Sequence, residues 1–183
     1  MIIFLIGFMG SGKSHYAKSL SAYLNVPCFD LDTEIERVEG KSINQIFAEN
    51  GEPYFRTRES VILKETVAYI HENALPGNAR NLVAVIACGG GTPCFEGNMD
   101  WMNQHGFTVW IAPPVSILAT RLEKEKEHRP LIREFSHAAL EEFIQMKLSE
   151  RTPYYEKARL IIQNPDIQVE EIIKSIKDES NLY

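Results

Sequence analysis

The stretch GFMGSGKS at residues 7–14 decides how the rest of the chain is interpreted. It matches the pattern GxxxxGK[ST], in which glycines let backbone N–H groups converge on phosphate oxygens. The apolar run Ile2–Ile6 before it predicts a buried strand, and the amphipathic stretch Ser14–Leu24 after it predicts a helix. The positive end of that helix would point at the same phosphates. The sequence therefore predicts a nucleotide-binding loop between the first strand and the first helix.

Two side chains of this loop have chemistry that a plain glycine-rich turn would not need. Lys13 is expected to neutralise the β- and γ-phosphates, and the Ser14 hydroxyl is expected to ligate Mg²⁺. A strand-to-helix turn without a ligand would not require a lysine and a serine at these positions.

Short apolar runs alternate with longer amphipathic stretches about five times along the chain. After the first strand and helix, strands are predicted at 26–29, 82–88, 107–111 and 160–163. Further helices are predicted directly after FDLD (29–32) and at 42–50, 52–73, 117–125, 139–150 and 169–177, and a surface loop at 74–81. This alternation predicts an α/β fold, a three-layer sandwich in which helices flank a five-stranded parallel sheet.

Composition limits the possible functions. The chain has 183 residues, which fits one domain spanning 1–183, and a net charge of −6 with a pI near 5.4, which disfavours sequence-independent nucleic-acid binding. No apolar run approaches the ~20 residues of a membrane span, and the apolar start lacks the basic region of a signal peptide. Cys28, Cys88 and Cys94 form neither a disulfide framework nor a zinc pattern. We expect a cytoplasmic protein.

Polar residues follow the second and third predicted strands, where ligands bind in open parallel sheets. FDLD at 29–32 places Asp30 and Asp32 after the second strand, and GGGTP at 89–93 follows the third. Because neighbouring carboxylates repel each other, the pair contributes little to folding by itself. One acid is expected to face the metal and the other a second substrate, as a base or hydroxyl acceptor. The alternative for Asp30 is a helix N-cap alone.

Several classes of nucleotide-binding protein are excluded by what the chain lacks. It contains neither the NKxD and DxxG motifs of GTPases nor the LSGG-type signature of transporter ATPases, and it is too short for helicase machinery. The remaining class is a small kinase that transfers the γ-phosphoryl group of ATP to a small acceptor.

Six stretches in this order resemble the shikimate kinases, small P-loop kinases of the nucleoside monophosphate kinase-like fold group: GFMGSGKS at 7, FDLD at 29, GEPYFRTRE at 51, GGGTP at 89, HRPLI at 128 and ERTPYYEKA at 150. The resemblance extends from Ile2 to about Ile176. It implies phosphorylation of the 3-hydroxyl of shikimate by ATP, with Mg²⁺ as cofactor, in aromatic amino-acid biosynthesis. It also implies a monomer, acceptor-binding helices at about 31–65 and a mobile lid at about 123–136.

The resemblance implies a role for each matching residue. Those implied to bind ATP are Gly10, Ser11, Gly12, Lys13, Ser14, His15, Arg121 and Arg129. Those implied to bind shikimate are Asp32, Arg56, Gly89, Gly90, Gly91 and Arg151. Ser14 and Asp30 would serve Mg²⁺. Asp32, as the base, Lys13 and Arg129, in the lid, would be the catalytic groups.

The chain departs from the family pattern at two places. His15 stands where a serine or threonine is usual, so a hydroxyl contact to phosphate is lost. The arginine that packs on adenine lies about seven residues before the lid arginine in the family, whereas Arg121 lies eight before Arg129.

Other interpretations stay open at this point. Arg56 could lie on a solvated helix face, Arg151 could pair with Glu150 or Glu156, and Arg129 could be a surface residue. The acceptor could be another polyol acid such as gluconate. The chain could also be a regulator that binds the nucleotide without turnover.

Overall fold

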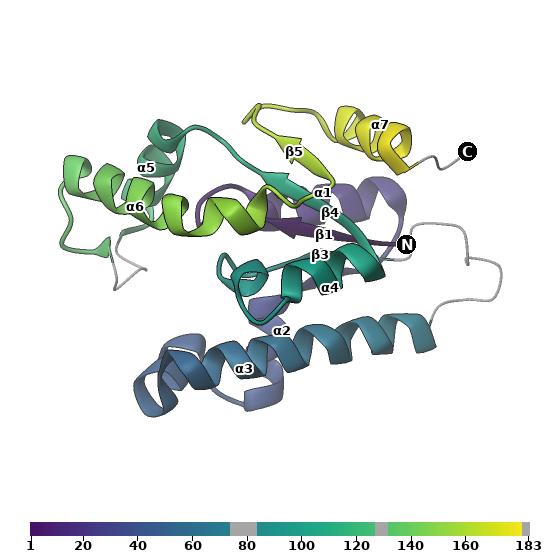
Figure 1. The fold of residues 1–183 in the computed structure, drawn as a ribbon, viewed down its shortest axis with the longest axis horizontal. Helices are drawn as coiled ribbons and strands as arrows, with labels where there is room; N and C mark the ends of the chain where they lie inside the picture. The colour runs from purple at the N-terminus through teal and green to yellow at the C-terminus, as the bar shows by residue number, and fades with distance from the viewer. Residues whose placement is uncertain (74–83, 127–131, 181–183) are drawn as a thin grey trace.

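The computed structural model describes residues 1–73, 84–126 and 132–180 (Figure 1). The expected loop at 74–81, and Arg129 in the expected lid, lie outside these residues. The elements in chain order are β1 (Ile2–Ile6), α1 (Lys13–Leu24), β2 (Cys28–Asp30), α2 (Leu31–Glu39), α3 (Ile43–Glu72), β3 (Ala84–Ala87), η1 (Thr92–Cys94), α4 (Asn98–His105), β4 (Gly106–Ile111), α5 (Val115–Lys124), α6 (His137–Tyr155), β5 (Leu160–Ile162) and α7 (Val169–Ser180).

The strands form one parallel sheet in the order β2-β3-β1-β4-β5. β1 is the central strand, and all five of its side chains are fully buried. An unbroken apolar run suits this position because helices cover both faces of the sheet. The predicted five-stranded parallel sheet between helical layers is confirmed.

Alternate residues of β1 contribute to two separate cores, as the twofold repeat of a strand requires. Ile2, Phe4 and Ile6 pack with apolar residues of α2, α3 and α4. Ile3 and Leu5 pack on the other face with residues of α1 and α7. Figure 1 shows α3 and α4 on one side of the sheet and α7 on the other.

A third apolar cluster joins α5 and α6 to the nucleotide-binding loop. Phe8 packs there with Leu118 and Leu122 of α5 and with Leu140 and Ile144 of α6. Figure 1 shows these two helices side by side at one end of the molecule. The loop is therefore supported by α5 and α6 as well as by the sheet.

The observed helices differ from the predicted ones mainly at α3, α6 and α4. The two helices expected at 42–50 and 52–73 form α3, which is broken at Gly51, where the backbone has φ 79° and ψ 173°. α6 continues beyond Glu150 through Pro153 to Tyr155, because the fully buried Tyr155 side chain packs against the sheet. α4 was not predicted, since this eight-residue helix buries only Asn98, Met99 and Met102. No helix within the described residues is long and apolar enough to cross a membrane.

Candidate active site

The nucleotide-binding loop leaves β1 through a glycine at which a side chain has no room. Gly7 has φ +142°, and a β-carbon there would lie 2.5 Å from the carbonyl oxygen of Ile111. Lys13, the first residue of α1, donates from Nζ to the carbonyl oxygen of Phe8 at 2.8 Å. The Ser11 hydroxyl is buried and has no hydrogen-bond partner among the described residues. A buried polar group without a partner is costly, so the loop carries one hydroxyl whose hydrogen-bonding capacity is unused.

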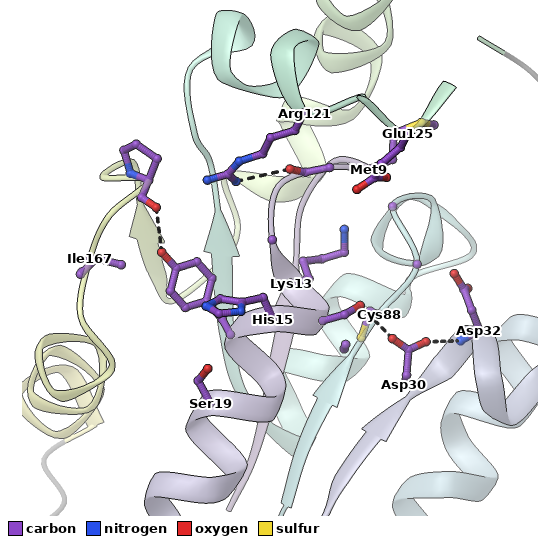
Figure 2. A pocket seen from close by; sticks show the side chains of 18 of the residues that line it. Met9, Lys13, His15, Ser19, Asp30, Asp32, Cys88, Arg121, Glu125 and Ile167 are labelled. Carbon is purple, nitrogen blue, oxygen red and sulfur yellow. Dashed lines mark hydrogen bonds between the residues drawn. The ribbon is translucent and has the colours of Figure 1, made fainter. Parts of the chain in front are cut away.

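A cleft of about 840 Å³ opens over this loop at the carboxyl ends of the strands. Of the residues expected to bind ligands, it is lined by Gly10, Gly12, Lys13, Ser14, His15, Asp30, Asp32, Gly89, Gly90 and Arg121. In Figure 2, Asp30 and Asp32 lie on one side of the cleft and Ile167 on the other, with Lys13 between them. The structure thus brings together residues from four separate parts of the chain.

Asp30 ends β2 and divides its two carboxylate oxygens between two partners. Oδ1 accepts hydrogen bonds from the backbone N–H groups of Asp32 at 3.1 Å and Thr33 at 3.4 Å, so Asp30 is the N-cap of α2. Oδ2 accepts a hydrogen bond from the Ser14 hydroxyl at 2.9 Å. The capping interpretation is therefore correct, but it leaves one oxygen beside the hydroxyl expected to ligate a metal.

Asp32 lies in the first turn of α2, where its carboxylate faces the cleft. The residue is exposed to solvent from the cleft, although neighbouring protein atoms reduce the hydration of its carboxyl group. Poor hydration, together with the negative charges of Asp30 and Glu59, raises its pKa to about 6, while Lys13 and Arg56 oppose the shift. A carboxyl group with a pKa near working pH can accept a proton and still be ionised at neutrality.

The turn Gly89–Gly91 has charged side chains packed where β-carbons would otherwise stand. A β-carbon on Gly91 would lie 2.4 Å from Cζ of Arg56, and one on Gly90 would lie 3.0 Å from an Nη of Arg151. One on Gly89 would lie 3.3 Å from Oδ1 of Asp32 and closer still to Glu59. The three glycines therefore allow two guanidinium groups and two carboxylates to gather around one short turn.

Arg56 forms an ion pair with Glu59, a residue that was not predicted from the sequence to belong to the site. Its Nη1 lies 2.7 Å from Oε2 of Glu59, whose side chain is 1% exposed, and its Nε lies 3.2 Å from Oε1 of Glu52. Glu59 also accepts a hydrogen bond from the Thr92 hydroxyl at 2.6 Å. A solvated helix face for Arg56 is therefore wrong. The buried position of Glu59 was not visible in the sequence because its partner Thr92 lies 33 residues away.

Arg151 projects from α6 toward the same turn. Its guanidinium carbon lies 5.4 Å from the centre of the Phe8 ring, and Arg151 forms no ion pair with Glu150 or Glu156 within the described residues. One turn later on α6, the buried Tyr155 hydroxyl donates to the carbonyl oxygen of Gly90 at 2.5 Å. α6 therefore holds the glycine turn as well as the arginine beside it.

Arg121 and His15 line the part of the cleft away from the two acids. Arg121 donates from Nη1 to the carbonyl oxygens of Ser11 at 3.1 Å and Gly10 at 3.4 Å. The exposed His15 ring stands edge-on to Tyr16, with centroids 5.5 Å apart. Pro165–Val169, after β5, completes this wall.

Comparison with known proteins gives a consistent result over nearly the whole chain. A family model described as "Shikimate kinase" matches residues 9–181. The shikimate kinase of Bacteroides thetaiotaomicron is 36% identical over 166 residues, which cover 91% of this chain and 88% of the relative. A crystal structure of shikimate kinase from the same organism has a TM-score of 0.84 and 33% identity, and covers 100% of this chain and 99% of its own. The structure of shikimate kinase from Acinetobacter baumannii in complex with shikimate has a TM-score of 0.77 and 30% identity, and the match covers 96% of this chain and 89% of that structure's chain.

Proposed function

This chain belongs to the shikimate kinase family, and we propose that it transfers the γ-phosphoryl group of ATP to the 3-hydroxyl of shikimate, a step of aromatic amino-acid biosynthesis. The products are shikimate 3-phosphate and ADP. One observation carries the proposal: Arg56, Arg151 and Asp32 gather around a single glycine turn at the edge of a cleft that begins at the nucleotide-binding loop. This arrangement suits an acceptor that carries both a carboxylate and hydroxyl groups.

The two arginines would bind the acceptor carboxylate. Guanidinium groups pair with carboxylates through two parallel hydrogen bonds, so each arginine supplies orientation as well as charge. Arg56 already has Glu59 as a partner and Arg151 rests on the Phe8 ring, so both are held in place before the acceptor binds. Such preorganisation reduces the entropy lost on binding.

Asp32 would act on the hydroxyl that attacks. The hydroxyl oxygen forms a bond to the γ-phosphorus while the bond from that phosphorus to the β–γ bridging oxygen breaks, and the hydroxyl proton passes to Asp32. Lys13 would offset the negative charge on the phosphates, and backbone N–H groups of Gly10, Ser11 and Gly12 would add to this stabilisation. Phosphoryl transfer depends mainly on such positioning and charge stabilisation.

Ser14 and Asp30 fit a magnesium ion. Hydroxyl and carboxylate oxygens are hard donors of the kind Mg²⁺ prefers, and Mg²⁺ usually keeps several waters and phosphate oxygens in place of protein ligands. Within the described residues there is no cluster of three or more histidine, cysteine or acidic side chains suited to a metal. When bound, the ion would neutralise charge on the β- and γ-phosphates.

We propose that the chain forms one domain, in which α2 and α3 as far as about residue 65 form the acceptor-binding part. Within the lid expected at 123–136, the structure describes 123–126 and 132–136, where Ile132 is buried against α5 and α6. Arg129 lies outside the described residues, so its role over the phosphates stays a prediction.

The test is ADP release with Mg²⁺ and ATP, measured with shikimate, with gluconate, with nucleoside monophosphates and with no acceptor. We expect release that depends on shikimate. Arg151→Lys keeps the charge but loses the paired hydrogen bonds, so it should raise the KM for shikimate and leave the KM for ATP unchanged. Release of ADP with gluconate in place of shikimate would overturn the acceptor assignment. Binding of ATP without release of ADP, whichever acceptor is added, would indicate a regulator.

A further inference from the structure

A buried tyrosine links the two ends of the nucleotide cleft. Tyr16 lies on α1, directly after the nucleotide-binding loop, and is 6% exposed. Its hydroxyl donates to the carbonyl oxygen of Pro165 at 3.0 Å, a contact between residues 149 positions apart. This bond joins the helix that begins at the phosphate site to the segment that follows β5.

The Tyr16 ring is fixed against the loop itself. A β-carbon on Gly12 would lie 3.6 Å from Cε2 of the ring, so the ring stands directly beside this residue of the loop. The ring also packs in the apolar core formed by α1, α7 and one face of the sheet. The hydroxyl therefore stands at a set distance from the phosphate site.

The segment 163–168 has neither helix nor strand. Two of its other hydrogen bonds join residues only two positions apart in the sequence. Asp166 N–H donates to Oδ1 of Asn164 at 3.0 Å, and Nε2 of Gln168 donates to the carbonyl oxygen of Asp166 at 2.9 Å. These bonds shape the segment but do not fix where it stands relative to the loop. Ile167 adds an apolar contact with the core, and Figure 2 shows it across the cleft from Asp32.

We propose that Tyr16 is a positioning residue for the nucleotide base: its hydrogen bond to Pro165 fixes the segment 163–168, which lines the same cleft as the phosphate-binding loop, where the base of a bound nucleotide would lie. The inference rests on the nucleotide-binding half of the proposed function. A base is recognised by backbone and side-chain groups that must stand in fixed positions, because a misplaced donor or acceptor gives no discrimination. Without the bond, the phosphates would bind as before and the base would bind less well.

The test distinguishes binding of the nucleotide base from binding of the phosphates. Binding of ADP and of inorganic tripolyphosphate is measured by calorimetry in the presence of Mg²⁺, without shikimate, for the unmodified protein and for Tyr16→Phe. The variant keeps the buried ring and loses only the hydroxyl. A matched control is Tyr23→Phe, the same change on the same helix at a side chain that is 54% exposed.

We expect Tyr16→Phe to weaken ADP binding about two- to tenfold, the usual effect of losing one neutral hydrogen bond, with tripolyphosphate binding unchanged. Tyr23→Phe should change neither. The ratio of kcat/KM for ATP to that for GTP should also fall in Tyr16→Phe.

Unchanged ADP binding would overturn the proposal, as would an equal loss for ADP and tripolyphosphate, which would make Tyr16 a support of the phosphate loop alone. Failure of the unmodified protein to bind ADP would overturn it too. ADP binding that follows the expected pattern, in a protein that does not turn over shikimate, would support the role of Tyr16 and refute the proposed reaction alone.

Discussion

Replacing Asp32 with asparagine should make the protein more stable at neutral pH while removing most of its activity. The folded protein holds this carboxylate among other negative charges and away from full hydration, so the pKa rises from 3.8 to about 6. At pH 7.5 the group is ionised in both the folded and the unfolded chain, and ionisation is less favourable in the folded one. Asparagine has a similar shape without the charge.

The size of the effect follows from the pKa. Each pKa unit corresponds to about 1.36 kcal/mol, so the shift sets a ceiling of about 3 kcal/mol on the free energy of unfolding. Solvent reaches the carboxylate from the cleft and screens these charges, which reduces the ceiling by about half. A negative charge in the first turn of a helix is worth about 0.5 kcal/mol, and the variant loses it. The net expectation is about 1 kcal/mol, or an increase of about 2–4 °C in Tm for a chain of this size.

Because the pKa of Asp32 is raised in the folded protein, the effect of the substitution on stability should depend on pH. As pH falls through 6, the folded protein takes up the proton first, so the unfavourable charge disappears from the unmodified protein. Urea unfolding of both proteins at pH 7.5 and pH 4.5 should therefore show a smaller advantage of Asp32→Asn at the lower pH. An Asp32→Asn variant that is no more stable at pH 7.5, or whose advantage is the same at both pH values, would refute this account of the carboxyl group.

Three other predictions concern the same site. In pH–rate profiles, kcat/KM for shikimate should fall as pH drops through about 6, since protonated Asp32 cannot accept a proton. Glu59→Gln removes a negative charge that raises the pKa of Asp32, so it should move the inflection of the profile to lower pH. An inflection that does not move would belong to another group. In Gly91→Ala the new methyl group would occupy the space of the Arg56 guanidinium and displace it. We therefore expect at least about a tenfold higher KM for shikimate with an unchanged KM for ATP in steady-state kinetics. Asp30→Ser keeps a good N-cap and removes the carboxylate, so thermal melts should change little while the Mg²⁺ concentration needed for half-maximal activity rises; a large loss of stability instead would leave only the capping role.

The sequence allowed the sheet and the cleft to be predicted because both depend on local patterns. Apolar runs identify buried strands, and the carboxyl ends of parallel strands meet at one edge of the sheet, so residues after successive strands could be placed together. Glu59 and Tyr16 could not be found in this way. Each acts through a partner on a distant segment, Thr92 or Pro165, and neither pairing leaves a periodic signal in the chain.

Asp30 explains how two adjacent carboxylates can serve different purposes at low cost. In the sequence, a helix cap and a metal-facing acid were alternatives, but the structure gives one oxygen of Asp30 to the start of α2 and the other to Ser14. The cap fixes the direction in which α2 begins, and that direction points the neighbouring Asp32 into the cleft. Charge repulsion between the two acids then contributes to the raised pKa of Asp32. The repulsion that disfavours FDLD as a purely structural element therefore adds to the poor hydration of Asp32, and the two together keep the second acid close to a proton-accepting pKa.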